Sequence, residues 1–373
     1  MSDKILSVLH VVRKMDMGGV QSMIMSYYRH TDRNKVQFDF AVQDTNPGLF
    51  DEEILSMGGK IYIINPVKKL FAYRKDLKKV IKQNKYTIVH IHQNFANVHG
   101  IIVAFFAGVK NIISHSHSNY DEKSFVKKII KKFLTGIINK LANHKYACSK
   151  TAAIWLYGKK AVEKNKTVII KNAISTEDYK FNAETRQKKR EELGLSEKVV
   201  IGHTGSFAEG KNHSFLIDIF NEIYKTNENV HMIFMGKGSI EEDMKNKAKS
   251  LNLENNISFL GVRTDVNEIL NAVDIFVFPS KFEGLGIVLI EAQASGLKCV
   301  MSDLVPQEAA VTDLVSVVSL DKPAEEWACC VLKELELSGD RRDMSEIIAD
   351  NGYDISKEAL KLQNEYLKMS NVL

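Results

Sequence analysis

The stretch PSKFEGLGIVLIEAQASG, residues 279–296, lies between two short apolar runs that are typical of buried strands, Ile275–Pro279 and Lys298–Met301. Its glycine-containing first half is typical of a loop, and Gly286–Ser295 has the residue pattern of a helix. A strand, a loop, a helix and a second strand in this order form a βαβ unit, whose strands pair in parallel. The stretch therefore predicts an α/β fold with helices covering a parallel sheet.

The same alternation continues through the chain in two series. Strand-like runs recur from Ile5–Val12 to Thr167–Ile170 and again from Val199–Thr204 to Val315–Val318, with helical patterns between them. Two such series in 373 residues predict two doubly wound, Rossmann-like domains.

The boundary between the predicted domains is expected between Ile170 and Lys198, because Asn182–Glu197 is polar, highly charged and without a strand signal. We assign residues 1–171 to the first domain and 172–351 to the second. The last part of the chain, Ser345–Met369, has a continuous helical pattern with no strand after it. Ligands of such open sheets lie at the carboxyl ends of the strands, so motifs at those ends are the main candidates for binding residues.

Composition excludes several other classes of protein. A hydrophobic content of 45% and a charged content of 26% are typical of a globular chain. The longest apolar run, Gly100–Val109, is about half the length of a membrane-spanning helix and predicts a buried core helix. The cysteines, Cys148, Cys299, Cys329 and Cys330, form no C-x-x-C pair, which argues against a disulfide framework or a thiolate zinc site. We expect a cytoplasmic protein.

Charge is distributed unevenly between the two halves. Residues 1–180 carry 30 Lys and Arg against 14 Asp and Glu, whereas residues 181–373 carry 21 against 32. The first half is therefore expected to meet an anionic partner such as a membrane surface, an anionic substrate or a nucleic acid, unless its lysines merely solvate helices. Residues 122–145, EKSFVKKIIKKFLTGIINKLANHK, form a basic amphipathic pattern. This pattern is typical of a helix on an anionic membrane and also of a core-packing helix with a lysine-rich outer face.

The loop at Glu283 has the features of a diphosphate site. Gly284 and Gly286 allow the backbone to approach a ligand, and the following helix start offers N–H groups and the positive end of a dipole. Glu283 and Glu291 are eight residues apart, about two helical turns, so both are predicted to face one cleft and accept sugar hydroxyls. The alternative is a helix-start glutamate and a surface glutamate. The apolar neighbours of Glu291 argue against that alternative.

Three other glycine-containing loops follow predicted strands. In IGHTGSFAEGKNHSFLIDIF, residues 201–220, Gly205 ends a strand and Lys211 opens a helix, where it pairs with a phosphate or faces solvent. Gly236 in MGKG belongs to a weak G-x-G signal. Gly18 and Gly19 connect the first strand to the first helix, and a plain tight turn explains them equally well.

Histidines gather at two neighbouring strand ends of the first half. His90 and His92 close one predicted strand, and His115 and His117 close the next. Three interpretations compete: a substrate contact by one histidine, a metal site of a metal-dependent hydrolase, or satisfied polar residues at strand ends. The hydrolase interpretation lacks a well-placed carboxylate or lysine at a later strand end.

Taken with their context, these motifs resemble the family-4 retaining glycosyltransferases, which share the GT-B fold of two facing Rossmann-like domains. The most specific match is the E-x7-E motif formed by Glu283 and Glu291 within PSKFEGLGIVLIEAQASG. The likeness extends over nearly the whole chain and is greatest to bacterial enzymes that build exopolysaccharide, capsule or O-antigen units. It implies that the final helix, residues 352–373, crosses back onto the first domain.

The resemblance assigns roles in binding a nucleotide-sugar donor. Glu283 would lie by the hydroxyls of the donor sugar, Glu291 would bind the ribose hydroxyls, and Lys211 would neutralise the diphosphate. The backbone of the loop would hold the diphosphate through Gly284, Leu285, Gly286 and Ile287. Gly236 and Val262 would line the nucleotide pocket.

The same likeness places other residues near the reacting sugar. His117 best matches the histidine close to the reacting carbon, with His115 as the alternative, so His117, Glu283 and Lys211 are the predicted catalytic residues. Gly18 and Gly19 match the loop near the phosphate and the acceptor.

The chain departs from the family after Gly205, where members commonly have Arg and this chain has Ser206. The diphosphate would then rest on Lys211 and backbone dipoles.

The implied reaction is transfer of a hexose or N-acetylhexosamine, with retention, from a donor that is most often a UDP-sugar to a lipid-linked or saccharide acceptor. No metal, cofactor or nucleic acid is expected, and the enzyme could rest on the inner face of the membrane. The alternatives are a sugar-nucleotide epimerase on the same fold, a metal-dependent hydrolase using His90, His92, His115 and His117, and a non-catalytic membrane adaptor.

Overall fold

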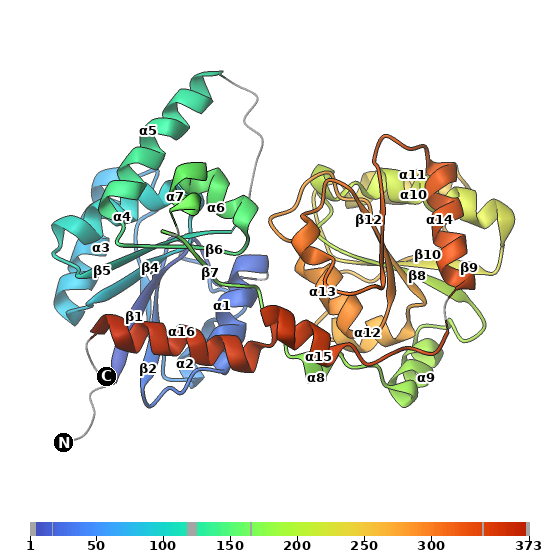
Figure 1. The fold of residues 1–373 in the computed structure, drawn as a ribbon, viewed down its shortest axis with the longest axis horizontal. Helices are drawn as coiled ribbons and strands as arrows, with labels where there is room; N and C mark the ends of the chain where they lie inside the picture. Colours follow the sequence, from blue (N-terminus) through green and yellow to red (C-terminus); the bar gives the residue numbers. More distant parts are fainter. Residues whose placement is uncertain (1–4, 17, 118–124, 165, 338, 371–373) are drawn as a thin grey trace. The chain divides into compact units, whose positions relative to one another are not determined.

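A computed structural model gives the fold and describes residues 5–16, 18–117, 125–164, 166–337 and 339–370. The chain divides into two compact units (Figure 1). Unit 1 comprises Met1–Ala173 and Ile355–Leu373, and unit 2 comprises Ile174–Asp354. Unit 2 is therefore inserted, in sequence, between the main part of unit 1 and its last helix.

Unit 1 is built on a parallel sheet with the order β3-β2-β1-β4-β5-β6-β7. The strands are β1 (Leu6–Val11), β2 (Val36–Val42), β3 (Ile61–Ile63), β4 (Ile88–Ile91), β5 (Asn111–Ser116), β6 (His144–Ala147) and β7 (Val168–Ile169). The helices are α1 (Gly19–Arg29), α2 (Asp51–Ser56), α3 (Leu70–Asn84), η1 (Asn94–Ala96), α4 (Asn97–Phe106), α5 (Phe125–Leu141), α6 (Lys150–Tyr157), α7 (Lys159–Glu163) and α16 (Ile355–Ser370).

Side chains of successive strand residues enter different cores, because they point to opposite faces of the sheet. Val8 and Phe38 belong to the core under α1 and α16, whereas Leu9 and Ala41 belong to the core under α3, α4 and α6. Figure 1 shows α16, in red, lying along β1 and β2, which it contacts. The end of the chain thus completes one layer of unit 1.

Unit 2 has a second parallel sheet with the order β10-β9-β8-β11-β12-β13. The strands are β8 (Val199–Thr204), β9 (Val230–Met235), β10 (Ile257–Phe259), β11 (Ile275–Phe278), β12 (Lys298–Ser302) and β13 (Val315–Val318). The helices are α8 (Thr176–Tyr179), α9 (Ala183–Glu192), η2 (Glu209–Lys211), α10 (His213–Thr226), α11 (Glu241–Ser250), α12 (Val266–Ala272), α13 (Ile287–Ala294), η3 (Gln307–Ala309), α14 (Ala324–Glu336), α15 (Ser345–Ile348) and η4 (Ala349–Tyr353).

Both sheets reverse their strand order once. In unit 1 the chain leaves β1 toward one edge and later continues from β4 toward the other edge. In unit 2 the same reversal lies between β8 and β11. At such a switch point the connections diverge and leave a crevice at the carboxyl ends of the strands, which is where ligands bind in open α/β sheets.

One sequence-based expectation was wrong in detail. Ser345–Met369 is not one helix, and the expected crossover helix of residues 352–373 begins only at Ile355 as α16. Gly352 has φ 75°, a left-handed conformation that interrupts the helical path. The polar segment Asn182–Glu197, for which the sequence shows no strand signal, contains helix α9.

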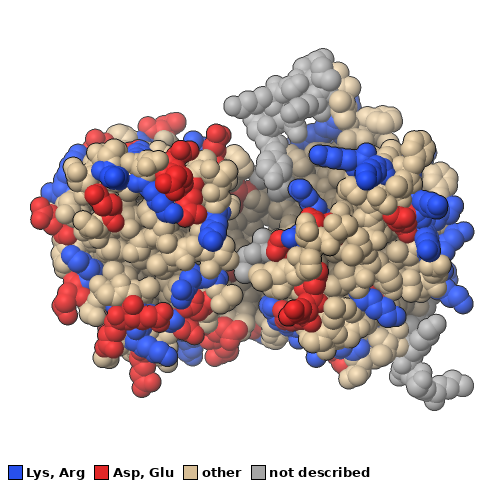
Figure 2. All heavy atoms as spheres, turned by 180° about the vertical axis from the view of Figure 1, so that it is seen from behind, with Lys and Arg blue, Asp and Glu red and all other residues tan. Residues whose placement is uncertain are grey.

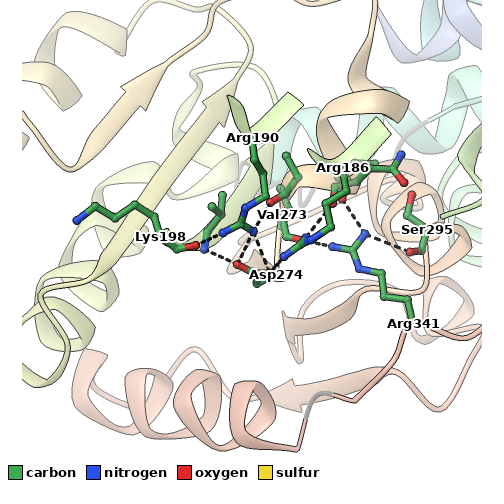
Figure 3. A network of polar contacts seen from close by, with 11 residues as sticks. Arg186, Arg190, Lys198, Val273, Asp274, Ser295 and Arg341 are labelled. Atoms are coloured by element: carbon green, nitrogen blue, oxygen red, sulfur yellow. Dashed lines mark hydrogen bonds and ion pairs between the residues drawn. The ribbon is translucent and has the colours of Figure 1, made fainter. Parts of the chain in front are cut away.

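A group of arginines fastens α9 to the amino-terminal edge of the sheet of unit 2 (Figure 3). Arg186 and Arg190 both form ion pairs with Asp274, at 2.5 and 3.1 Å, directly before β11. Arg341 joins the group through the carbonyl oxygens of Leu270 and Val273, and burial lowers its pKa to about 9. The positive charge of these three guanidinium groups is thereby offset by one carboxylate and by the carbonyl groups at the carboxyl end of α12.

Replacing that carboxylate is expected to destabilise unit 2. Asp274→Asn keeps the volume of the side chain but leaves Arg186 and Arg190 without their anion, so the free energy of unfolding should fall by about 2–4 kcal/mol. Urea unfolding monitored by circular dichroism measures this change. Asp321→Asn, at an exposed carboxylate, is the control and should shift the midpoint little. Equal midpoints for the two variants would contradict the prediction.

Candidate functional site

The switch point of unit 2 brings two distant loops together. The Nζ atom of Lys211, in the loop after β8, lies 2.6 Å from Oε1 of Glu283, in the loop after β11. Their side chains are only 22% and 10% exposed, and the ammonium also lies 5.2 Å from the ring centre of Phe278. A positive and a negative group are therefore held, partly desolvated, at the carboxyl ends of the two central strands.

Backbone contacts fix these two loops to each other. The N–H of Lys281 donates to the carbonyl oxygen of Gly210 at 2.8 Å, and the Asn212 side chain donates to that of Pro279 at 3.1 Å. A Cβ atom on Gly210 would lie 2.7 Å from the half-exposed ring of Phe282, so a larger residue there would require this ring to move. The position of Lys211 relative to Glu283 is thus set by the loop backbones.

The loops after β8 and β9 also pack closely. The N–H of Gly205 donates to the carbonyl oxygen of Met235 at 2.9 Å. A Cβ atom on Gly236 would lie 2.0 Å from the carbonyl oxygen of Gly205, which explains the glycine in MGKG. Ser206 follows on the surface, exposed to solvent. The structure therefore gathers Gly205, Ser206, Gly236, Lys211 and Glu283 around one sheet edge.

The loop Glu283–Gly286 leads directly into α13. Gly286 adopts φ 88°, which favours glycine, and α13 begins one residue later than expected, at Ile287. Leu285 is buried and anchors the loop. The first turn of α13 contains no acidic residue, so its N–H groups and dipole offer an attractive field to an anion.

Glu291 has a different environment from Glu283. The prediction that both face one cleft across two helical turns was based on a wrong premise, because only residues from Ile287 onward are helical. Glu291 is hydrogen-bonded to Tyr179 of α8, and burial raises the pKa of its carboxyl group to about 7 despite that bond. Tyr179 was not predicted, because it is distant from Glu291 in the chain and does not directly follow a strand.

Val262 lies at the rim of a surface pocket of about 460 Å³. Its side chain is 49% exposed. The other residues lining the pocket are Lys189, Arg263, Thr264, Asp265 and Glu268. Arg263 and Lys189 both bond to Asp265, and the side-chain hydrogen bond from Arg263 is the main cause that lowers the pKa of that carboxyl.

Unit 1 carries the remaining predicted residues at its own carboxyl edge. The backbone N–H of His117 donates to the side-chain oxygen of Asn94 at 3.0 Å, and its ring is half-buried, with the pKa lowered to about 3 by burial. His115 is fully buried, so His117 is the member of the pair that reaches the surface. Gly18 and Gly19 lead from β1 into α1, and a Cβ atom on Gly19 would meet nothing within 4 Å.

Comparison with protein families gives two consecutive matches. Residues 17–178 match Glycosyltransferase Family 4, and residues 185–350 match Glycosyl transferases group 1. The division between the matches falls close to the division between the two units.

Several curated proteins are similar to this chain. The putative glycosyltransferase EpsF of Bacillus subtilis is 31% identical over 96% of both chains. The capsular polysaccharide biosynthesis glycosyltransferase CapH of Staphylococcus aureus is 27% identical over 97% of this chain and 99% of its own. The UDP-Gal:alpha-D-GlcNAc-diphosphoundecaprenol alpha-1,3-galactosyltransferase of Escherichia coli is 26% identical over 80% of each.

A solved structure shares the fold over the full length. The crystal structure of Anabaena HepE in complex with UDP and glucose aligns with a TM-score of 0.78 and 19% identity, covering 99% of this chain and 100% of that one.

The raised pKa of Glu291 predicts a pH-dependent stability. The folded chain keeps a proton on Glu291 up to about pH 7, whereas the unfolded chain releases it near the ordinary value of 4.5. Stability from the neutral carboxyl is therefore complete below the ordinary value and is lost as the pH rises through 7, at up to about 1.4 kcal/mol per pH unit.

Glu291→Gln stays neutral at every pH and is expected to become more stable than the native chain as the pH rises from about 5 to about 8. Thermal unfolding across this range measures the difference. Glu325→Gln, at an exposed carboxylate, should show a constant difference. A constant difference for Glu291→Gln as well would mean that Glu291 is already ionised at low pH.

Proposed function

The chain belongs to the family 4 glycosyltransferases, and from this premise we propose that it transfers a hexose or N-acetylhexosamine from a UDP-sugar to a lipid-linked or saccharide acceptor. At the coarser level it is a GT-B glycosyltransferase of polysaccharide biosynthesis that uses nucleotide-sugar donors. The proposed binding of the donor in unit 2 is based on the Lys211–Glu283 pair at the switch point of that unit.

The donor diphosphate is proposed to replace Glu283 as the partner of Lys211. A diphosphate carries more negative charge than one carboxylate, and it can also use the N–H groups at the start of α13. Glu283, once released, becomes an acceptor for hydroxyl groups of the donor sugar. Glu291 accepts the ribose hydroxyls, with Tyr179 orienting its carboxyl group.

The departing nucleoside diphosphate gains charge as the glycosidic bond breaks. Lys211 and the N–H dipoles of α13 stabilise that charge in place, without a need to reorganise solvent. Ser206 adds no charge to this loop, so Lys211 is the principal cation of the proposed diphosphate site. We propose a front-face reaction that retains the anomeric configuration and in which a donor phosphate oxygen accepts the acceptor proton.

Unit 1 is proposed to hold the acceptor beside Gly18, Gly19 and His117. At the carboxyl ends of β2 and β3 lies a pocket of about 390 Å³ whose lining includes the amide or carboxylate groups of Asp44, Asn65 and Asp76. Such groups are suited to bonding saccharide hydroxyls. The choice of UDP, and of a lipid-linked acceptor, is supported by the names of the Escherichia coli relative and by the ligands of HepE.

Membrane contact through α5 is proposed as the means of reaching a lipid-linked acceptor. Ile129, Ile130 and Phe133 of α5 are 56%, 52% and 69% exposed. Farther along the same helix, apolar side chains pack into the core of unit 1, namely Leu134, Ile137, Ile138 and Leu141, so only the first half of α5 presents apolar side chains to solvent. Lys128 and Lys132 are exposed beside them. Figure 2 shows Lys and Arg side chains prominent over unit 1, whereas Asp and Glu are more abundant over unit 2.

Phe105 and Phe106 of the neighbouring α4 are also exposed, at the end of that helix. Within the described ranges, every helix is too short or too polar to span a bilayer. Residues 122–124 of the predicted amphipathic segment lie outside the description, and His144–Ala147 is strand β6 rather than helix.

Substitution of the ion pair separates donor binding from sugar transfer. Lys211→Met is expected to weaken UDP binding, because the main cation of the diphosphate site is lost. Glu283→Gln is expected to leave UDP affinity equal or higher, because Lys211 is freed, and to lower kcat by about 100-fold, because the donor sugar is poorly held. Calorimetry with UDP and a transfer assay with a panel of UDP-sugars and lipid-linked acceptors measure both.

The matched control is Lys225→Met with Glu222→Gln, an exposed ion pair of the same length, 2.6 Å. This variant should behave as the native chain. Intact transfer by both site variants would refute the site assignment, and donor conversion in the absence of any acceptor would identify an epimerase instead.

Charge reversal on α5 tests the membrane proposal. Lys128→Glu with Lys132→Glu is expected to reduce binding to vesicles of anionic phospholipid by at least about tenfold, since each basic residue contributes about 1 kcal/mol near such a surface. Vesicle sedimentation measures binding. Lys188→Glu with Lys249→Glu, exposed in unit 2, makes the same net change and should bind as the native chain does. Equal losses in the two variants would mean that only net charge matters.

A further inference from the structure

A patch of imidazole rings replaces aliphatic side chains on one face of the sheet of unit 1. His10 of β1 lies in register with His90 of β4, and His92 follows on the same face. His115 and His117 extend the patch at the end of β5, with their rings stacked at 4.0 Å. All but His117 are buried. The sequence pointed to the two H-x-H pairs but not to His10.

The rings are connected by hydrogen bonds. His92 bonds to His10 through Nε2, at 3.0 Å, and to His117 through Nδ1, at 2.8 Å. His90 bonds to Nδ1 of His115 through Nε2, at 3.1 Å, and to the hydroxyl of Tyr366 of α16 through Nδ1, at 2.7 Å. Burial lowers the pKa of every ring of the patch.

Several ring nitrogens of the patch remain without a hydrogen-bond partner. They are Nε2 of His10, Nε2 of His115 and Nδ1 of His117. A buried polar atom without a partner costs about 1–3 kcal/mol. Valine or isoleucine at these strand positions would avoid that cost, so the patch points to a ligand rather than to packing.

We propose that His92, His115 and His117 form a binding site for a transition-metal dication of the Zn²⁺ class. One ligand nitrogen from each ring lies within 4.8 Å of those of the other two. Imidazole is a preferred ligand of zinc, copper, nickel and iron, and three histidines leave a further coordination position open.

Neighbouring side chains form hydrogen bonds with the proposed ligand rings, as is usual in metal sites. Ligating histidines usually bond through their other nitrogen, which fixes the ring and its tautomer. Here the other nitrogen of His92 bonds to His10, and Nδ1 of His115 bonds to His90, which is bonded in turn to Tyr366. Nε2 of His115 is left available as the ligand atom.

A second group, His10, His90 and His92, also has closely spaced ligand atoms. That group is less suited, because both ring nitrogens of His90 are bonded to groups outside it, Tyr366 and His115, and all three rings are buried. In the first group the Nδ1 bond of His92 is made to His117, so a metal ion would replace a bond between two of its own ligands. The group that includes His117 instead ends in a half-buried ring at the carboxyl edge, where an ion can enter.

Metal at this site is proposed to regulate transfer rather than to take part in it. This consequence, unlike the site itself, rests on the proposed function, in which His117 lies near the reacting sugar. A bound ion would hold the His117 ring and lower the transfer rate, and a chelator would restore it.

Cobalt(II) and zinc titrations of the untagged, full-length chain test the site. We expect about one equivalent of Co²⁺ to bind, with the visible absorption of a low-coordinate cobalt–imidazole centre, and Zn²⁺ to displace it. His92→Gln and His115→Gln should each abolish the absorption. His10→Phe, which removes only a supporting ring, should weaken binding by about 10–100-fold.

Thermal unfolding of each variant confirms that it is folded, and His30→Gln, at an exposed histidine of the same unit, should bind cobalt as the native chain does. The proposal is overturned if the folded native chain gives no cobalt absorption, or if the absorption survives in both His92→Gln and His115→Gln. If the chain binds cobalt but transfers no sugar in the metal-free form, the metal site is supported and the proposed function is refuted.

Discussion

The arrangement of this molecule depends on one constraint, that all strands of a parallel sheet end at the same edge. Each unit reverses its strand order once, between β1 and β4 and between β8 and β11. The candidate binding and catalytic side chains lie at these two reversals. They are the histidine patch in unit 1 and the Lys211–Glu283 pair in unit 2. In unit 2, Gly236 and Gly238 follow β9 in this region, because a Cβ atom at either position would overlap the backbone of the loop after β8.

The opposite edge of unit 2 has a different character. There Arg186 and Arg190 bond to the carboxylate of Asp274 (Figure 3). Arg341 bonds to carbonyl oxygens at the end of α12. Nearly every donor in that network has an acceptor within the protein, so it has little capacity left for a ligand. At the carboxyl edge, by contrast, Lys211 has a partner that a stronger anion can displace. One edge of the sheet is suited to stability and the other to binding.

Much of the fold was predictable from the sequence, because short β-branched runs and glycine loops are local signals. The strands β8 and β13 were predicted with the bounds that the structure has, and the α/β class followed from the alternation of strand-like and helical patterns along the chain. Details that depend on single backbone angles were not predictable: Gly286 delays α13, and Gly352 separates α15 from α16.

The site was predicted as separate motifs rather than as an arrangement. Pairing of Lys211 with Glu283 joins residues 72 positions apart, and no local pattern encodes it. Tyr179 beside Glu291 and His10 beside His92 were missed for the same reason. His10 did carry a usable signal, since it stands near the end of the first predicted strand and parallel pairing would bring it beside His90.

The position of α16 has a consequence for how the protein is made. Ile355, Leu362 and Tyr366 belong to the core that also contains Val8 and Phe38, although all of unit 2 lies between them in sequence. A chain that emerges from the ribosome amino terminus first can complete unit 2, which is continuous, before the core of unit 1 receives its last layer. Until the final helix has been translated, one face of the sheet of unit 1 is therefore covered only in part, by α1.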